Sequence, residues 1–118
     1  MAAPFYPTLK ANQFFGNSPA GGLGWGGPAA LGAQLADRDR LVVNVVGDGS
    51  HLFANPVVCH QVAKANDLPV LTVVLNNAGW DAVRLSALEV YPDGVTSGLD
   101  QVPLTEFGAN PDHRRVAE

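Results

Sequence analysis

The chain has 118 residues and a mass of 12.3 kDa, which suits one domain and leaves no room for a two-domain enzyme. Charged residues make up 15% of it, against roughly 25% in a typical soluble domain, so we expect other protein to cover part of its surface. The net charge of −4 and the scattering of the seven basic residues argue against any nucleic-acid partner.

No feature of the sequence indicates membrane insertion or secretion. The longest apolar runs, residues 41–46 and 70–75, are far shorter than the roughly 20 residues that cross a bilayer. Residues 1–4 lack the charged and apolar regions of a secretory signal, and the single Cys59 cannot form an internal disulfide. We therefore expect a cytoplasmic protein with no membrane association.

The first third of the chain passes from irregular structure into a helix and a strand. Residues 1–15 are rich in breakers and predict an irregular lead-in, or a segment added by cloning, before a domain over residues 16–118. A glycine loop at residues 21–27 leads into a predicted helix over residues 29–36, with Pro28 in its first turn. The apolar run at 41–46 is typical of a central strand buried on both faces.

A second helix and strand complete a βαβ unit. Gly47-Asp48-Gly49-Ser50 predicts a loop, Asn55 a helix cap, and Pro56 the start of a helix that ends near Asn66. Residues 70–75 predict a second buried strand, which must run parallel to the first. The fold class is therefore α/β. Further on we expect a helix at 82–88, a turn at 91–94, irregular structure at 95–110 and a helix that starts at Pro111.

Asp48 and Asn77 each follow one of the two predicted strands. Because the carboxyl ends of parallel strands share one edge of a sheet, their side chains should converge there. Carboxylate and amide oxygens suit Mg²⁺ or Ca²⁺, and Mg²⁺ completes its coordination with phosphates and water. Gly47 and Gly49 allow close approach of a ligand, and Ser50 can donate to an anion. The pattern favours a metal and phosphate site, although either short motif alone is more often an ordinary turn.

The spacing of these motifs resembles that of a known family. G-D-G followed by N-N, with 26 residues between Gly49 and Asn76, is similar to the diphosphate and metal motif of thiamin-diphosphate-dependent enzymes. Residues 18–33 resemble the glycine loop and helix of the acetolactate synthase and benzoylformate decarboxylase group, and the resemblance extends from Gly16 to about Thr105. It implies a three-layer α/β/α fold with a parallel sheet, apparently truncated at the C-terminus.

The resemblance also implies roles for individual residues. Asp48, Asn77 and the Gly79 carbonyl would ligate Mg²⁺. In the glycine loop, the Gly21 carbonyl would accept a hydrogen bond from the aminopyrimidine, and Leu23 would be an apolar wedge under the cofactor. The implied set of cofactor-binding residues is Gly21, Gly22, Leu23, Gly47, Asp48, Gly49, Ser50, Asn77 and Gly79.

The implied activity is the decarboxylation or carboligation of 2-oxo acids, by a lyase or transferase whose cofactor serves as an electron sink for loss of CO₂. In the family the activating glutamate lies on a pyrimidine-binding domain of the same or another chain, so we expect a homo-oligomer and an inactive isolated chain. His51 is a weak candidate acid or base. Val83 stands where pyruvate decarboxylases carry a catalytic acid, which argues against that branch.

Two alternatives remain open from the sequence. Gly22-x-Gly24-x-x-Gly27 fits the dinucleotide (NAD) fingerprint of a Rossmann fold, and Asp48 lies 21 residues beyond it. That fingerprint requires a strand directly before the glycines, and residues 17–20 are a poor strand end. The other alternative is a cofactor-binding remnant without catalysis.

Overall fold

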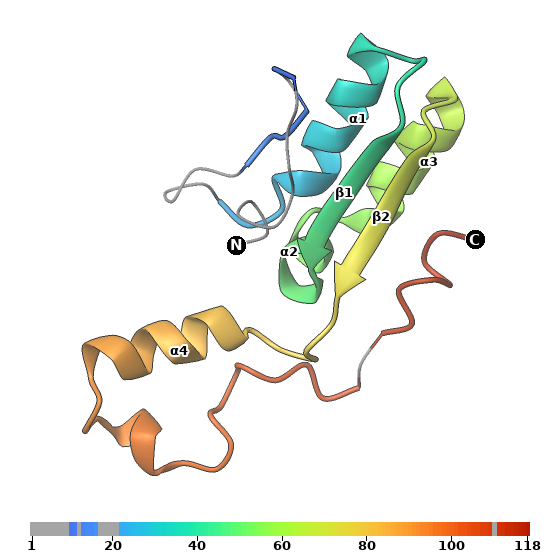
Figure 1. The fold of residues 1–118 in the computed structure, drawn as a ribbon. Helices are drawn as coiled ribbons and strands as arrows, with labels where there is room; N and C mark the ends of the chain where they lie inside the picture. Colours follow the sequence, from blue (N-terminus) through green and yellow to red (C-terminus); the bar gives the residue numbers. More distant parts are fainter. Residues whose placement is uncertain (1–9, 12, 17–21, 110) are drawn as a thin grey trace.

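The structure is a computed structural model, and it describes residues 10–11, 13–16, 22–109 and 111–118. The elements follow in the order helix α1 (Gly26–Ala36), strand β1 (Val42–Gly47), helices α2 (Asp48–Phe53) and α3 (Pro56–Asn66), strand β2 (Val70–Leu75), helix α4 (Asp81–Val90) and the 3₁₀ helix η2 (Val95–Gly98) (Figure 1). Within these residues no helix has the length and apolar character needed to cross a membrane.

The two strands pair in parallel, with Val42 opposite Val70 and Gly47 opposite Leu75. Helices α2 and α3 make the crossover between them, which confirms the predicted α/β fold with a parallel βαβ unit. Both strands lie within one residue of their predicted bounds, because apolar runs bounded by polar turns mark them locally.

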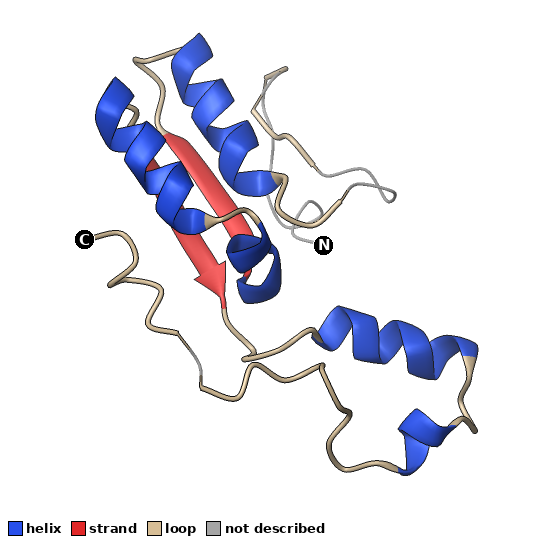
Figure 2. Cartoon of the chain, turned by 180° about the vertical axis from the view of Figure 1, so that it is seen from behind, coloured by secondary structure: helices blue, strands red, loops and turns tan. Residues whose placement is uncertain are grey.

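Helices cover only one face of this sheet in the described residues, as Figure 2 shows from behind. On β1, Asn44 and Val46 point toward the helices and are buried, whereas Val43 and Val45 are 48% and 53% exposed. Leu71, Val73 and Leu75 of β2 are exposed in the same alternation. The prediction of a central strand buried on both faces is therefore wrong for the described residues, since they supply no layer over the second face and no third strand.

Helix α4 and η2 belong to an arm, residues 81–104, which projects from the carboxyl end of the sheet (Figure 1). Neither α4 nor η2 contains a buried residue. The radius of gyration is 16.4 Å, against about 13.5 Å for a compact chain of this length. The accessible surface is 8814 Å², against about 6,100 Å² for a compact protein of this mass. Among the described residues, a compact body, residues 26–75, therefore contrasts with the extended arm.

Several local predictions are corrected. Residues 48–50 form the start of α2 and not a loop, which places the Asp48 carboxylate at the favourable N-terminal end of a helix. Asn55 precedes α3 in a left-handed conformation, φ 53°, and its side chain makes no cap hydrogen bond. Pro111 does not begin a helix. Residues 113–116 form turns, because a helix this short has too few internal bonds to stabilise it without tertiary packing.

Candidate functional site

The Asp48 carboxylate joins two loops at the carboxyl end of the sheet. It lies at the start of α2, directly after β1, and the residue is only 2% exposed. Its Oδ1 accepts a hydrogen bond from the Gly49 amide at 2.9 Å. Its Oδ2 accepts from the amides of Asn77, at 3.2 Å, and Ala78, at 2.8 Å, in the loop after β2. The structure thus brings Asp48 and the Asn77 loop together, as the topology predicted.

This arrangement leaves oxygen atoms free to bind a cation. A carboxylate offers about four lone-pair sites, and three amides use three of them on Asp48. The Asn77 Oδ1 accepts one bond, from the Gly79 amide at 3.2 Å, and so retains a lone pair. Both are hard oxygen donors of the kind that Mg²⁺ and Ca²⁺ prefer, so the donor chemistry of the site fits such an ion.

Gly79, the third predicted ligand, lies in an isolated antiparallel bridge with Glu106. The bridge is closed by bonds from the Trp80 amide to the Thr105 carbonyl at 2.6 Å and from the Phe107 amide to the Ala78 carbonyl at 3.1 Å. Neither bond uses the Gly79 carbonyl. A Cβ at position 79 would lie 2.5 Å from the Thr105 carbonyl oxygen, so this close approach requires glycine.

The glycine loop is fixed to α2 by one hydrogen bond, from the Gly24 amide to the Ser50 Oγ at 3.0 Å. Gly24 has φ 87°, and a Cβ there would lie 3.0 Å from backbone atoms of Phe53 and Ala54. This loop therefore lies beside the predicted diphosphate residues Gly49 and Ser50. Of the other predicted residues in it, Gly22 and Leu23 are exposed, and Gly21 lies outside the described residues.

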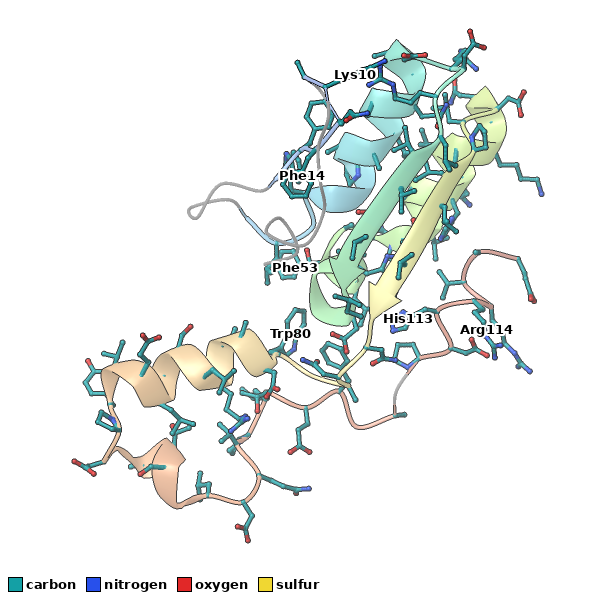
Figure 3. All side chains as sticks on the ribbon, viewed as in Figure 1. Lys10, Phe14, Phe53, Trp80, His113 and Arg114 are labelled. Carbon is teal, nitrogen blue, oxygen red and sulfur yellow. The ribbon has the colours of Figure 1, made fainter. Side chains whose placement is uncertain are left out.

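An aromatic group closes the side of the site next to the arm. The Trp80 ring lies 6.1 Å from the ring of Phe53, edge to face (Figure 3). It lies 5.0 Å from the ring of Phe107, also edge to face. A Cβ on Gly49 would lie 2.7 Å from the Trp80 ring. The sequence showed no sign of Phe53 and Phe107 in this role, because a bridge between distant segments brings Phe107 here.

His51 does not share hydrogen bonds with this site. Its ring packs at 6.3 Å from that of His60 and 5.4 Å from that of His113. It lines an interior cavity together with Asn44 and Thr72, on the helix-covered face of the sheet. Burial, and then the nearby His113 and His60, lower the pKa of His51 below its ordinary value. The structure therefore gives no support to His51 as an acid or base beside Asp48.

Comparisons with known proteins identify relatives of this chain. The family model described as "Thiamine pyrophosphate enzyme, C-terminal TPP binding domain" matches residues 1–118. Benzoylformate decarboxylase of Pseudomonas aeruginosa is 42% identical over 92 residues, which is 76% of this chain and 16% of that protein. Acetolactate synthase 3, chloroplastic, of Brassica napus is 41% identical over 76 residues, which is 64% of this chain and 11% of that protein.

A solved structure is also similar, the thiamine diphosphate-dependent 4-hydroxybenzoylformate decarboxylase of Rhodococcus jostii RHA1. The TM-score is 0.65 at 30% identity, and the match covers 80% of this chain and 16% of that one. The chain belongs to the family of C-terminal thiamine pyrophosphate-binding domains found in acetolactate synthase-like and benzoylformate decarboxylase-like enzymes. It spans 19% of the length of the acetolactate synthase isozyme 3 large subunit of Escherichia coli, and less of the two curated relatives above.

These findings do not favour the dinucleotide alternative. The family model and the solved structure both point to thiamin diphosphate, which is another name for thiamine pyrophosphate.

Proposed function

We propose that this domain binds thiamin diphosphate through a Mg²⁺ ion held by Asp48, the Asn77 amide oxygen and the Gly79 carbonyl. The observation that carries this proposal is the buried Asp48 carboxylate, which bonds to backbone amides of the loop after β2 and has one lone-pair site left. A buried carboxylate next to a diphosphate needs a cation between them, since the two anions would otherwise repel each other.

The surrounding residues have distinct roles in this proposal. Gly47, Gly49 and Ser50 hold the diphosphate, and the bond between Ser50 and Gly24 keeps the glycine loop within reach of the same ligand. Gly21, Gly22 and Leu23 contact the pyrimidine end. Once bound, the cofactor supplies the electron sink for loss of CO₂ from a 2-oxo acid. The contribution of this chain is to bind and orient the cofactor.

We further propose that the domain works inside a larger cytoplasmic enzyme, a homo-oligomer that decarboxylates or carboligates 2-oxo acids. The printed names of the relatives, acetolactate synthase and benzoylformate decarboxylase, support this reaction class. A pyrimidine-binding domain, from the same or another chain, completes the site. We expect 2-oxo acid turnover only when this partner is added, and turnover by the isolated chain would contradict the proposal.

Isothermal titration calorimetry tests the cofactor site directly. The chain should bind thiamin diphosphate in the presence of Mg²⁺ and not in the presence of excess chelator. Asp48→Asn should weaken this binding by more than roughly 100-fold, the upper end of what loss of a supporting partner costs a metal site. Asp39→Asn is the matched control, because Asp39 is exposed and lies in the turn between α1 and β1, far from the carboxyl end of the sheet.

A second variant separates binding from folding. Asp48 is buried, so its replacement could weaken the fold itself, whereas Asn77 is exposed and its side chain accepts one hydrogen bond. Asn77→Ala should therefore leave the far-ultraviolet circular dichroism unchanged and still reduce the Mg²⁺-dependent affinity. Unchanged affinity in both variants, or NAD binding without metal, would overturn the proposal.

A further inference from the structure

Three histidines from different parts of the chain meet beside β2. His51 lies on α2, His60 on α3, and His113 in the C-terminal segment, residues 111–118. The ring of His51 is 5.4 Å from that of His113 and 6.3 Å from that of His60. All three line a groove of about 660 Å³ between β2 and this segment, and Figure 3 shows His113 next to the strand. We name them the histidine cluster.

Ring nitrogens of this cluster are buried without hydrogen-bond partners. His51 is 6% exposed, and its Nε2 has no partner within the described residues. Both nitrogens of His113 are also shielded from solvent and unpartnered in that part of the chain. No group of three His, Cys, Asp or Glu side chains there is arranged to hold a metal ion. A proton is a species to which such nitrogens respond, because the ordinary pKa of a histidine is 6.5.

A positive charge on one of these imidazoles would have little nearby negative charge to stabilise it. The charged or titratable groups that face His51 across the groove and the interior cavity are His60 and Cys59 of α3, and Asp112, His113 and Arg114 of the C-terminal segment. The strands contribute the neutral Asn44 and Thr72. The one carboxylate, that of Asp112, already pairs with Arg114 at 3.4 Å and Arg115 at 3.7 Å. A charged imidazole would thus meet other imidazoles and no free anion.

We propose that the histidine cluster is a pH-dependent latch, which holds segment 111–118 against β2 and α3 at neutral pH and releases it in acid. The ordinary pKa of a histidine is 6.5, and burial, together with His113 and His60, lowers that of His51 in the docked state. The docked state therefore has its full stability above about pH 6.5 and loses it as the pH falls through the lowered pKa. Release brings the ring nitrogens into water, where they can be protonated.

Nuclear magnetic resonance on the full 118-residue chain tests this latch. At about pH 7.5 a nuclear Overhauser effect should join the ring protons of His51 and His113, and it should disappear as the pH falls through the lowered pKa of His51. Contacts between β1 and β2 should persist at both pH values. Each unit by which the pKa of docked His51 lies below its ordinary value raises the ratio of released to docked segment about tenfold at low pH.

Two variants decide between a latch and simple packing. His51→Phe keeps an aromatic ring but cannot be protonated, so the contact between positions 51 and 113 should survive at the pH that releases the unaltered segment. Glu118→Gln, the control, alters an exposed charge of the same segment that does not line the groove, and it should leave the pH of release near that of the unaltered chain. The proposal is overturned by a contact that persists with His51 protonated, by release of the His51→Phe segment at the original pH, or by loss of the β1–β2 contacts at the same pH.

Discussion

The body and the arm both contain regular helices, but they differ in how many of their side chains are buried. The buried residues of the structure lie in the body, among them Ala30, Val46 and Leu68. Helix α4 is as regular as α3, yet it buries nothing. The arm exposes a series of large apolar side chains: Val83, Leu85, Val90, Val95 and Leu104. The difference teaches that burial needs a surface to pack against, and within the described residues the body alone has a sheet for that purpose.

The two regions also differ in how they are connected. The body is held by a parallel ladder of six residue pairs between β1 and β2 and by helices packed on it. The arm returns to the site through the bridge of Gly79 with Glu106 and the ring contact between Trp80 and Phe107. Substitutions in the body should therefore alter the stability of the whole domain. Substitutions in the arm should affect the rest of the molecule through this bridge.

The largest effect is expected from one substitution made in both regions. Leu68→Ala removes a side chain that is 4% exposed and should lower the free energy of unfolding by about 2–5 kcal/mol. Leu85→Ala makes the same change on α4, where the side chain is 54% exposed, and should stay within about 0.5 kcal/mol. Urea unfolding followed by circular dichroism measures both. Equal losses would show that the arm is packed in solution.

A smaller effect is expected at the bridge. Gly79→Ala places a Cβ 2.5 Å from the Thr105 carbonyl oxygen and should cost about 1–3 kcal/mol through overpacking. Gly98→Ala is the matched control in the arm, because a Cβ there meets no atom within 4 Å. In a Trp25→Phe background, the near-ultraviolet circular dichroism should lose the signal of packed Trp80 in the first variant only. An unchanged signal would mean that the bridge does not position this ring.

Local features of the sequence were enough to predict most elements and one part of the site. The apolar runs gave both strands, and the βαβ rule placed Asp48 and Asn77 at one edge of the sheet. Helix α3 begins at Pro56 and ends at Asn66, as predicted. These predictions succeed because each depends on periodicity, on turn residues or on the fixed direction of parallel strands.

Features that depend on distant contacts could not be predicted in this way. Nothing near Phe107 in the sequence shows that it packs against Trp80. Because His51 directly follows the phosphate loop in the sequence, it was predicted to lie beside that loop. In the structure His51 belongs to α2, and its ring packs near that of His113 on the helix-covered side of the sheet. The exposed face of β1 was not predicted either, because an apolar run does not reveal which layers of the fold cover a strand.

The smallest effect is expected at the exposed end of the C-terminal segment. Hydrogen bonding by Arg114 lowers the pKa of Asp112 below its ordinary value of 3.8. Arg114→Gln should raise that pKa toward 3.8, while Arg115→Gln, at the longer contact of 3.7 Å, should raise it less. Carbon-13 shifts of the carboxyl group measure both changes. Because the pKa is lowered, the pairing stabilises the segment above about pH 3.8 and is lost only as the pH falls through the lowered value. The docked state of His51, in contrast, begins to lose stability below about pH 6.5. Two separate transitions are therefore expected, and a shift of the histidine transition in Arg114→Gln would show that the two groups are coupled.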